Sequence, residues 1–257
     1  MKKIALVTGV SQGIGYGIAS QLAKQGAKVF IMARNEERLV QISNKLKAEG
    51  LDVVACAADI TDRPSLNQKI KKIISEEGKI DILVNNAGLM PFPGPLQDLD
   101  DQLWDDMIEV NLTGTYNVTK AVLPSMLANR FGRIINISSV SARKTVGMFV
   151  GYAAAKGGLH AFTAALANEV TSAGITVNCI LPGFTETEEM HRIWGTLAKN
   201  AGMTEDEILA PFWQQVPIGR WIQPEEIGAV VAFLAGENAG VVSGQIIKVD
   251  GGYDNHE

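Results

Sequence analysis

Short runs rich in β-branched residues alternate with longer helical runs along almost the whole chain. The helical runs have the spacing of one buried face, and Gly26, Asn35 and Gly50 are typical of residues at helix ends. Strands that alternate with helices form a parallel sheet covered by helices on both faces. The short runs predict buried strands at residues 3–9, 28–33, 51–59, 80–88, 132–139, 174–183 and 244–252.

This alternation predicts an α/β fold, a doubly wound (Rossmann-type) sheet of seven parallel strands with helices on both faces. Right-handed crossovers would place ligands at the carboxyl ends of the strands. The longest helical patterns cover about 101–130 and 152–172. No linker divides the chain, so we expect a single domain over 1–257, with a substrate-lid insertion at about 184–222.

Composition narrows the classes of function. The net charge of -5 disfavours nucleic acid or an anionic membrane as the main partner, and no apolar run is long enough to span a bilayer. Cys56 and Cys179 each lie in an apolar run, which indicates free buried thiols and a cytoplasmic protein. No cysteine and histidine cluster has metal-ligand spacing, so we expect no metal. We interpret His160, inside a helical pattern, as structural rather than as a ligand.

A glycine-rich turn follows the first predicted strand. The stretch TGVSQGIG, residues 8–15, places Gly9, Gly13 and Gly15 where a strand gives way to a helix. Glycines there let the backbone approach a pyrophosphate at the helix N-terminus. The spacing differs from the commoner G-x-G-x-x-G pattern, and a tight turn without a ligand remains an alternative for this motif alone.

Several further motifs follow in a fixed order. They are NNAG at 85–88, Asn111 in NLTG, Ser139 placed 13 positions before Tyr152, Lys156 four positions after it, LPGFTET from 181, and SGQIIKVDGGY from 243. With the glycine turn they resemble the short-chain dehydrogenase/reductase family, in its compact single-domain branch, over essentially residues 3–253. The resemblance implies an NAD(P)-dependent oxidoreductase that moves a hydride between nicotinamide and a carbonyl or secondary-alcohol carbon.

The chemistry of the motif residues agrees with this activity. Tyr152 and Lys156 share one helix face, and a nearby ammonium would lower the pKa of a phenol, which is otherwise near 10. Tyr152 can then exchange a proton with the substrate oxygen, and Ser139 can hydrogen-bond the same oxygen. By resemblance, Lys156 also holds the nicotinamide ribose, and Asn111 supports a water-linked proton path. A tyrosine and lysine pair alone would not establish this, because such pairs are common on helices.

The end of the second strand bears on the choice of cofactor. Ala33 stands where enzymes that use NAD place an acidic residue, and Arg34 follows it. An arginine there can bind a 2′-phosphate, so we expect NADP(H), with NAD(H) possible and Arg34 as a merely solvated charge the alternative. By resemblance, the cofactor is bound by Gly9, Ser11, Gln12, Gly13, Ile14, Gly15, Arg34, Asp59, Ile60, Asn86, Ala87, Gly88, Tyr152, Lys156, Pro182, Gly183, Thr185 and Thr187.

The substrate is expected over Ser139 and Tyr152 and is a small-molecule ketone or alcohol. The candidate lining residues are Met90, Phe92, Ser141, Met148 and Trp194, although some of these apolar residues can instead fill the core or a subunit interface. Arg143 and Lys144 can meet an anionic substrate or lie on the surface. The lid is longer than in most ketoreductases of fatty-acid synthesis, which weakens that assignment without excluding it.

Other functions remain as alternatives. A 3-oxoacyl-carrier-protein-type ketoreductase belongs to the same family, whereas a sugar-nucleotide epimerase of the extended branch would need a larger C-terminal domain. A non-catalytic redox sensor would typically lack the tyrosine or the lysine. The resemblance also implies a homotetramer, or at least a dimer, in which the helical segments at 101–130 and 152–172 pair with their counterparts in a second copy.

Overall fold

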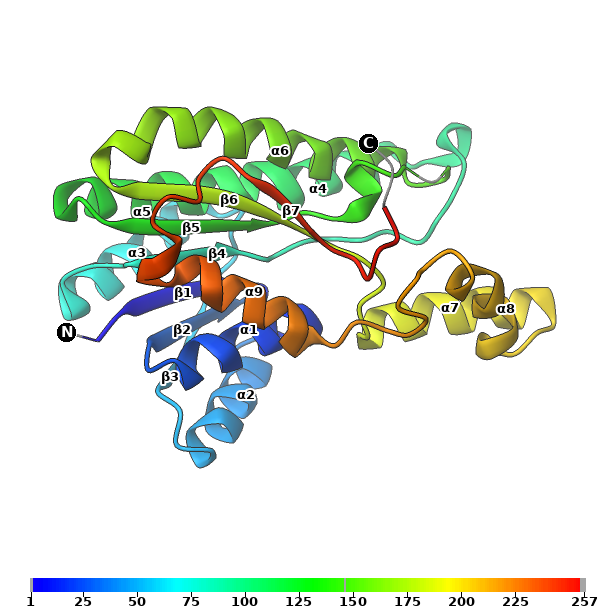
Figure 1. The fold of residues 1–257 in the computed structure, drawn as a ribbon, viewed down its shortest axis with the longest axis horizontal. Helices are drawn as coiled ribbons and strands as arrows, with labels where there is room; N and C mark the ends of the chain where they lie inside the picture. Colours follow the sequence, from blue (N-terminus) through cyan, green and yellow to red (C-terminus); the bar gives the residue numbers. More distant parts are fainter. Residues whose placement is uncertain (1, 146, 255–257) are drawn as a thin grey trace.

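The computed structural model describes residues 2–145 and 147–254; Met1, Val146 and residues 255–257 of the expected domain lie outside it (Figure 1). In the described chain, seven strands form one sheet in the order β3-β2-β1-β4-β5-β6-β7, and every adjacent pair is parallel. The predicted doubly wound sheet is therefore confirmed. Its strands are β1 (Ile4–Thr8), β2 (Lys28–Ala33), β3 (Val53–Ala57), β4 (Ile82–Asn85), β5 (Gly132–Ile137), β6 (Ile175–Pro182) and β7 (Ile246–Val249).

Helices cover both faces of this sheet and enclose two separate apolar cores (Figure 1). One layer contains α1 (Gly13–Lys24), α2 (Glu36–Ala48) and α9 (Pro224–Ala235). The opposite layer contains α3 (Arg63–Glu77), α4 (Asp101–Ile108), α5 (Gly114–Asn129) and α6 (Val150–Val170). The helices α1 and α9 pack so closely that a Cβ atom on Gly17 would lie 2.4 Å from the carbonyl of Pro224. The small residue at this crossing thus allows two helices of the same layer to pack closely.

The pattern at 101–130, predicted as one helical run, is interrupted in the structure. A five-residue π-helical turn at Glu109–Thr113 separates α4 from α5. Such turns insert one residue into a helix and are frequent at functional sites. The periodicity of the sequence gives no sign of this interruption, which places the buried Asn111 at the junction.

The insertion expected at about 184–222 folds into two helices, α7 (Glu188–Ala201) and α8 (Glu205–Trp213). Its two ends are paired: the Ile222 amide donates to the Phe184 carbonyl (2.8 Å), and the Glu186 amide donates to the Ile222 carbonyl (2.9 Å). The helices project beyond the end of the sheet where β6 and β1 finish (Figure 1, yellow and gold). This pairing holds the insertion over the carboxyl edge of the sheet.

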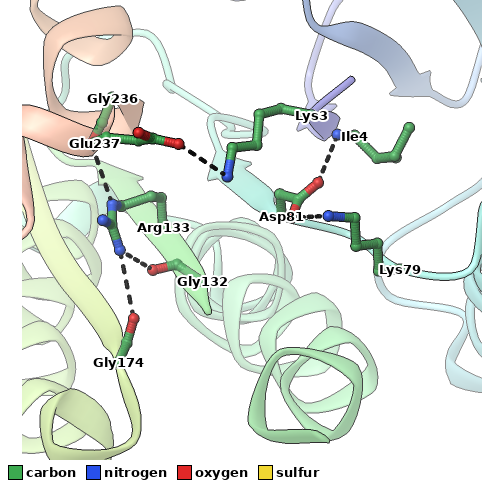
Figure 2. A network of polar contacts seen from close by, with 9 residues as sticks. All are labelled: Lys3, Ile4, Lys79, Asp81, Gly132, Arg133, Gly174, Gly236 and Glu237. Carbon is green, nitrogen blue, oxygen red and sulfur yellow. Dashed lines mark hydrogen bonds and ion pairs between the residues drawn. The ribbon is translucent and has the colours of Figure 1, made fainter. Parts of the chain in front are cut away.

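The opposite, amino edge of the sheet carries a network of charged side chains (Figure 2). Arg133 of β5 is buried, and its guanidinium donates to the carbonyls of Gly132 (2.9 Å), Gly174 (3.4 Å) and Gly236 (3.4 Å). Beside it, Asp81 accepts from the Ile4 amide (2.9 Å). These bonds join the start of β5 to the segments that follow α6 and α9.

The described residues contain neither a membrane-spanning helix nor a cluster of potential metal ligands. Across residues 2–145 and 147–254, no helix is long and apolar enough to cross a membrane. In the same residues, no three His, Cys, Asp or Glu side chains gather as potential metal ligands.

Candidate active site

The end of β5 meets one face of α6, and this contact brings the predicted catalytic side chains together. Lys156 is buried, and its ammonium donates to the carbonyl of Ile137, the last residue of β5 (3.0 Å). Ser139, two residues further on, lies close enough to Tyr152 to lower the pKa of its phenol. The Lys156 Nζ atom lies 5.8 Å from the centre of the Tyr152 ring. Three of the four predicted catalytic residues therefore form one cluster at the carboxyl edge of the sheet.

The protonation of this cluster differs from the expectation that Lys156 lowers the pKa of Tyr152. Burial raises the pKa of Tyr152 to about 12, and the hydrogen bond from Ser139 opposes this only in part. Burial also lowers the pKa of Lys156 to about 8, while the nearby Cys179 thiol acts in the opposite direction. Because desolvation disfavours the charged form of both groups, it outweighs their mutual attraction. Tyr152 is consequently a neutral phenol at neutral pH and can donate a proton.

Asn111, the fourth predicted catalytic residue, is held by the π-helical turn. Its side-chain amide donates to the carbonyls of Leu89 (2.8 Å) and Met107 (3.0 Å), and its Oδ1 atom accepts from the Leu89 amide (3.1 Å). Gly88 lies between Asn111 and Lys156, since a Cβ atom on it would be 2.9 Å from Asn111 Oδ1 and 3.2 Å from Lys156 Nζ. The geometry thus places Asn111 next to the cluster, behind Gly88.

The glycine-rich turn forms a cradle at the start of α1. Gly9 and Gly13 have φ angles of 71° and 55°, which L side chains rarely adopt. A Cβ atom on Gly9 would lie 2.6 Å from Ala87 Cα, and one on Gly15 would lie 2.5 Å from the Gly9 carbonyl. Unpaired amides at a helix N-terminus attract phosphate groups. The backbone at this turn therefore fits a dinucleotide pyrophosphate.

The NNAG segment after β4 is hydrogen-bonded to this glycine-rich turn. The Asn86 side chain donates to the carbonyls of Thr8 and Gly9 (3.0 Å each). The Thr8 hydroxyl in turn accepts from the amides of Asn86 (3.1 Å) and Ala87 (3.0 Å). The Asn86 side-chain amide is thus engaged within the protein, where it fixes the backbone of the glycine turn.

The remaining predicted cofactor residues also lie at the carboxyl edge. Ile60 follows β3, but its side chain is buried against Gly114, so only its backbone is available to a ligand. The Asp59 carboxylate accepts from the Thr61 amide (2.9 Å) and hydroxyl (2.8 Å). Ser11, Gln12 and Ile14 belong to the turn, and Pro182, Gly183, Thr185 and Thr187 connect β6 to α7.

Two arginines mark the end of β2, and sequence reasoning identified only one of them. Arg34 is exposed immediately after the strand. Arg38, in the first turn of α2, donates to the Ser11 carbonyl and the Gln12 side chain (3.2 Å), and it forms an ion pair with Glu188 of α7 (3.0 Å). Because Arg38 lies far from the glycine turn in sequence, only the fold reveals that it joins this turn to the lid.

A cavity of about 520 Å³ opens above Ser139 and Tyr152. Four of the five candidate lining residues line it, namely Met90, Ser141, Met148 and Trp194. Phe92 does not, and lies instead on a smaller neighbouring cavity of about 160 Å³.

Aromatic residues of the lid form much of the larger cavity wall. Phe184, Phe212 and Tyr253 line it together with Trp194, and the Phe184 and Tyr253 ring centres are 5.2 Å apart. Of the two candidate anion-binding residues, Lys144 lines the cavity and donates to the Tyr253 carbonyl (2.8 Å), whereas Arg143 pairs with Asp254 (2.9 Å). The wall is predominantly apolar, and Ser139 and Tyr152 are among the polar side chains that line it.

Comparison with known proteins assigns the fold and the site to a family. The sequence pattern described as short chain dehydrogenase matches residues 3–198. The chain belongs to the short-chain dehydrogenase family. It is accordingly an NAD(P)-dependent oxidoreductase that interconverts carbonyl and secondary-alcohol groups, as the sequence predicted.

Relatives of this short-chain dehydrogenase match it along nearly its whole length. It is 39% identical to the granaticin polyketide synthase putative ketoacyl reductase 1 of Streptomyces violaceoruber, over 99% of this chain and 94% of that protein. It is 42% identical to the 3-oxoacyl-acyl-carrier-protein reductase FabG of Escherichia coli K12, over 97% and 96% of the two chains.

Solved structures give the same result. A variant of actinorhodin polyketide ketoreductase, solved with NADPH, superimposes with a TM-score of 0.94 at 37% identity and covers 99% of this chain and 98% of its own. A putative gluconate dehydrogenase from Agrobacterium tumefaciens gives 0.89 at 33% identity, over 98% and 95% of the two chains. Because ketoreductases match across the lid as well, its length does not argue against a ketoreductase.

Proposed function

We propose that this short-chain dehydrogenase reduces bulky, predominantly apolar ketones with NADPH. The observation that carries the proposal is the position of Ser139 and Tyr152 at the floor of a 520 Å³ apolar cavity, beside the glycine turn. A ketone in this cavity would bury its carbon skeleton against the aromatic wall and direct its oxygen to the hydroxyls of Ser139 and Tyr152. The names of the polyketide and 3-oxoacyl reductases support the same reaction.

The side chains at the floor supply the proton chemistry. Tyr152, held as a neutral phenol, donates its proton to the ketone oxygen, and Ser139 donates a hydrogen bond to that oxygen as negative charge develops. Lys156 places a cation beside the phenol and stabilises the phenolate that remains. Asn111, next to Lys156 behind Gly88, would support a water-linked proton path that leads away from the ammonium.

The residues of the chain fit a dinucleotide cofactor. The turn at Gly9 and Gly13 offers backbone that no Cβ atom obstructs, and the N-terminus of α1 would hold the pyrophosphate. The second strand ends without an acidic residue, which removes the carboxylate that would repel a 2′-phosphate. When bound, the nicotinamide supplies the hydride that reduces the substrate carbon.

The choice between NADPH and NADH rests on Arg34. A guanidinium forms charge-assisted bonds to a 2′-phosphate, so Arg34→Ala should raise the KM for NADPH roughly tenfold and leave the KM for NADH almost unchanged. Arg38→Ala is the matched control, because it loosens the glycine turn that both cofactors share and should weaken both equally. A wild type that prefers NADH would overturn the NADPH assignment.

The substrate class can be tested with three compounds at fixed NADPH: a bicyclic ketone, a linear 3-oxoacyl thioester and the oxidised form of a sugar acid. We expect the highest kcat/KM for the bicyclic ketone and little turnover of the sugar acid, because the cavity offers few polar partners. Trp194→Arg should selectively impair the apolar substrates. A preference for the sugar acid would contradict the proposal.

We also propose that the protein is a cytoplasmic homotetramer. The outward face of α6 carries small residues, with Ala154, Ala161 and Ala164 exposed, and such a face permits close approach of a second copy. The exposed Tyr116 and Leu127 of the neighbouring α5 add apolar surface. Light scattering that gave only a 27.6 kDa particle at micromolar concentration would contradict an oligomer.

A further inference from the structure

Three successive residues at the end of β5 face three successive turns of α6. The Ile137 carbonyl accepts from the Lys156 ammonium, and Ser139 lies beside Tyr152 in the wall of the same cavity. Between them, Ser138 meets His160, one turn beyond Lys156 on the same helix face. The proposed mechanism uses the outer two contacts and leaves the middle one, between Ser138 and His160, without a role.

The Ser138 hydroxyl makes two hydrogen bonds in this middle contact. It donates to the backbone carbonyl of Lys156 (2.9 Å) and lies 3.1 Å from His160 Nε2. A hydroxyl has one proton, so with that proton on Lys156 the partner at Nε2 must be a donor. The geometry therefore assigns a proton to Nε2 of His160. Ser138 is itself buried, and its amide donates to the Ile180 carbonyl of β6 (2.8 Å), which fixes the hydroxyl relative to the sheet.

We infer that Ser138 and His160 are positioning residues for Lys156. The Ser138 hydroxyl binds the backbone carbonyl of Lys156 to the segment directly after β5. The Ile137 carbonyl, at the last residue of β5, binds the Lys156 ammonium. His160 orients the hydroxyl so that its proton points to Lys156. The pair thereby sets the distance between the ammonium and the strand end that carries Ser139. The inference rests on the proposed function, because it assigns these two residues to the same site.

Titration of His160 does not break this arrangement. Burial lowers its pKa, and the positive charge of Arg143 lowers it further. The other charged or titratable groups around Ser138 are Lys156 and the Cys179 thiol of β6. Both the neutral Nε2–H tautomer and the imidazolium donate from Nε2, so the bond to Ser138 persists on either side of the transition. The positioning role consequently predicts no additional acidic limb in the pH dependence of kcat.

Four variants test the inference. His160→Leu and Ser138→Ala should each lower kcat roughly fivefold, with the KM for the ketone unchanged, as expected for the loss of one buried hydrogen bond. His160→Gln keeps an N–H donor on a side chain of similar reach and should recover most of the loss. Thr163→Val is the matched control, because Thr163 accepts from Asn136 (2.9 Å) and ties the same strand to the same helix one turn further from the site. It should lower the melting temperature without lowering kcat.

Three results would overturn the inference: His160→Leu within twofold of wild-type kcat, no recovery in His160→Gln, or an equal loss of kcat in Thr163→Val. A readout independent of turnover is the ¹⁵N NMR signature of the imidazole, assigned by comparison with His160→Gln. We expect the Nε2–H tautomer in the wild type, and the Nδ1–H tautomer there would equally contradict the inference. Wild-type turnover of ketones tests the proposed function separately, so the two failures can be told apart.

Discussion

Arg133 and Lys156 are buried cations near opposite ends of β5. Arg133 belongs to the strand, whereas Lys156 belongs to α6, and the two differ in the number of partners for their donors. At the amino end of β5, the guanidinium of Arg133 donates to three backbone carbonyls and stacks 4.5 Å from the centre of the Phe131 ring (Figure 2). At the carboxyl end, the ammonium of Lys156 donates to one carbonyl, that of Ile137. Burial lowers the pKa of both groups.

The difference shows how this fold separates stability from chemistry. A buried cation needs partners for its donors, and Arg133 finds them in the segments that follow α6 and α9. Lys156 has three donors and, within the described chain, one carbonyl partner, so its remaining donors are available to other groups at the site. The amino edge therefore holds the layers together, while the carboxyl edge keeps polar groups free for a substrate and cofactor.

The largest expected effect comes from Tyr152→Phe at the carboxyl edge. Only the phenolic oxygen is removed, so the ring still fills its buried place in the site. Loss of a general acid typically costs 10²–10⁴-fold, and we expect kcat to fall about a thousandfold. Cofactor affinity, measured by NADPH fluorescence, should change little. A variant that kept most of its rate would show that Tyr152 is not the proton donor.

Lys156→Met distinguishes the role of the buried ammonium in turnover from its effect on stability. The variant keeps a long apolar stem but removes the charge beside Tyr152, and we expect kcat to fall about a hundredfold and cofactor binding to weaken. The melting temperature should stay the same or rise, because a poorly partnered buried charge opposes folding. A large loss of stability would place Lys156 in the same class as Arg133.

Arg133→Met is the reciprocal change at the amino edge. It leaves the carbonyls of Gly132, Gly174 and Gly236 without their donor, at a cost of about 1–3 kcal/mol in the free energy of unfolding. For a chain of this size the melting temperature should fall by several degrees, which calorimetry can measure. The kcat per folded molecule should stay within twofold of the wild type. A selective loss of kcat would mean that the two edges are coupled.

The sequence predicted the sheet and the catalytic cluster because both depend on local signals. Buried parallel strands read as continuous apolar runs, and β2 was predicted with its exact bounds, Lys28–Ala33. Tyr152 and Lys156 are neighbours on one helix, so their spacing alone places them together. The pKa shifts of Tyr152 and Lys156 could not be predicted from this spacing. Desolvation is the largest cause of both shifts, and it depends on all the segments that bury the two side chains.

What the sequence missed depends on contacts between distant segments. Arg38 meets Ser11 and Glu188 only because α2, the glycine turn and the lid converge at one edge. The π-helical turn at Asn111 lies inside a stretch that was predicted as one helical run, and Arg133 was not singled out within its predicted strand. Phe92 was assigned to the cavity from its apolar character, but it lines the smaller cavity, whereas Met90 and Pro93 of the same segment line the larger one. Such features require the folded chain.

The smallest expected effect distinguishes the two cations by pH. Burial lowers the pKa of Lys156 from 10.5 to about 8, whereas it lowers the pKa of Arg133 from the much higher ordinary value of a guanidinium. Between about pH 8 and 10.5 the unfolded chain keeps the Lys156 proton and the folded chain does not. The unfolded state then binds more protons, so this group adds stability as the pH rises through that window and loses it as the pH falls through 8.

The burial of Tyr152, with its pKa near 12, acts in the opposite direction above pH 10, and so does that of Cys179, with its pKa near 11, above pH 9. Comparison with Lys156→Met removes these shared contributions. Urea unfolding of both proteins at pH 7.5, 8.5 and 9.5 should show that the free energy of unfolding of the wild type rises relative to that of the variant by at most about 1.4 kcal/mol per pH unit above pH 8.

The same comparison with Arg133→Met should give a difference in the free energy of unfolding that does not depend on pH. If the Lys156→Met difference is also flat, the ammonium keeps its ordinary pKa in the folded protein, and the contrast between the two edges is one of partners rather than of charge.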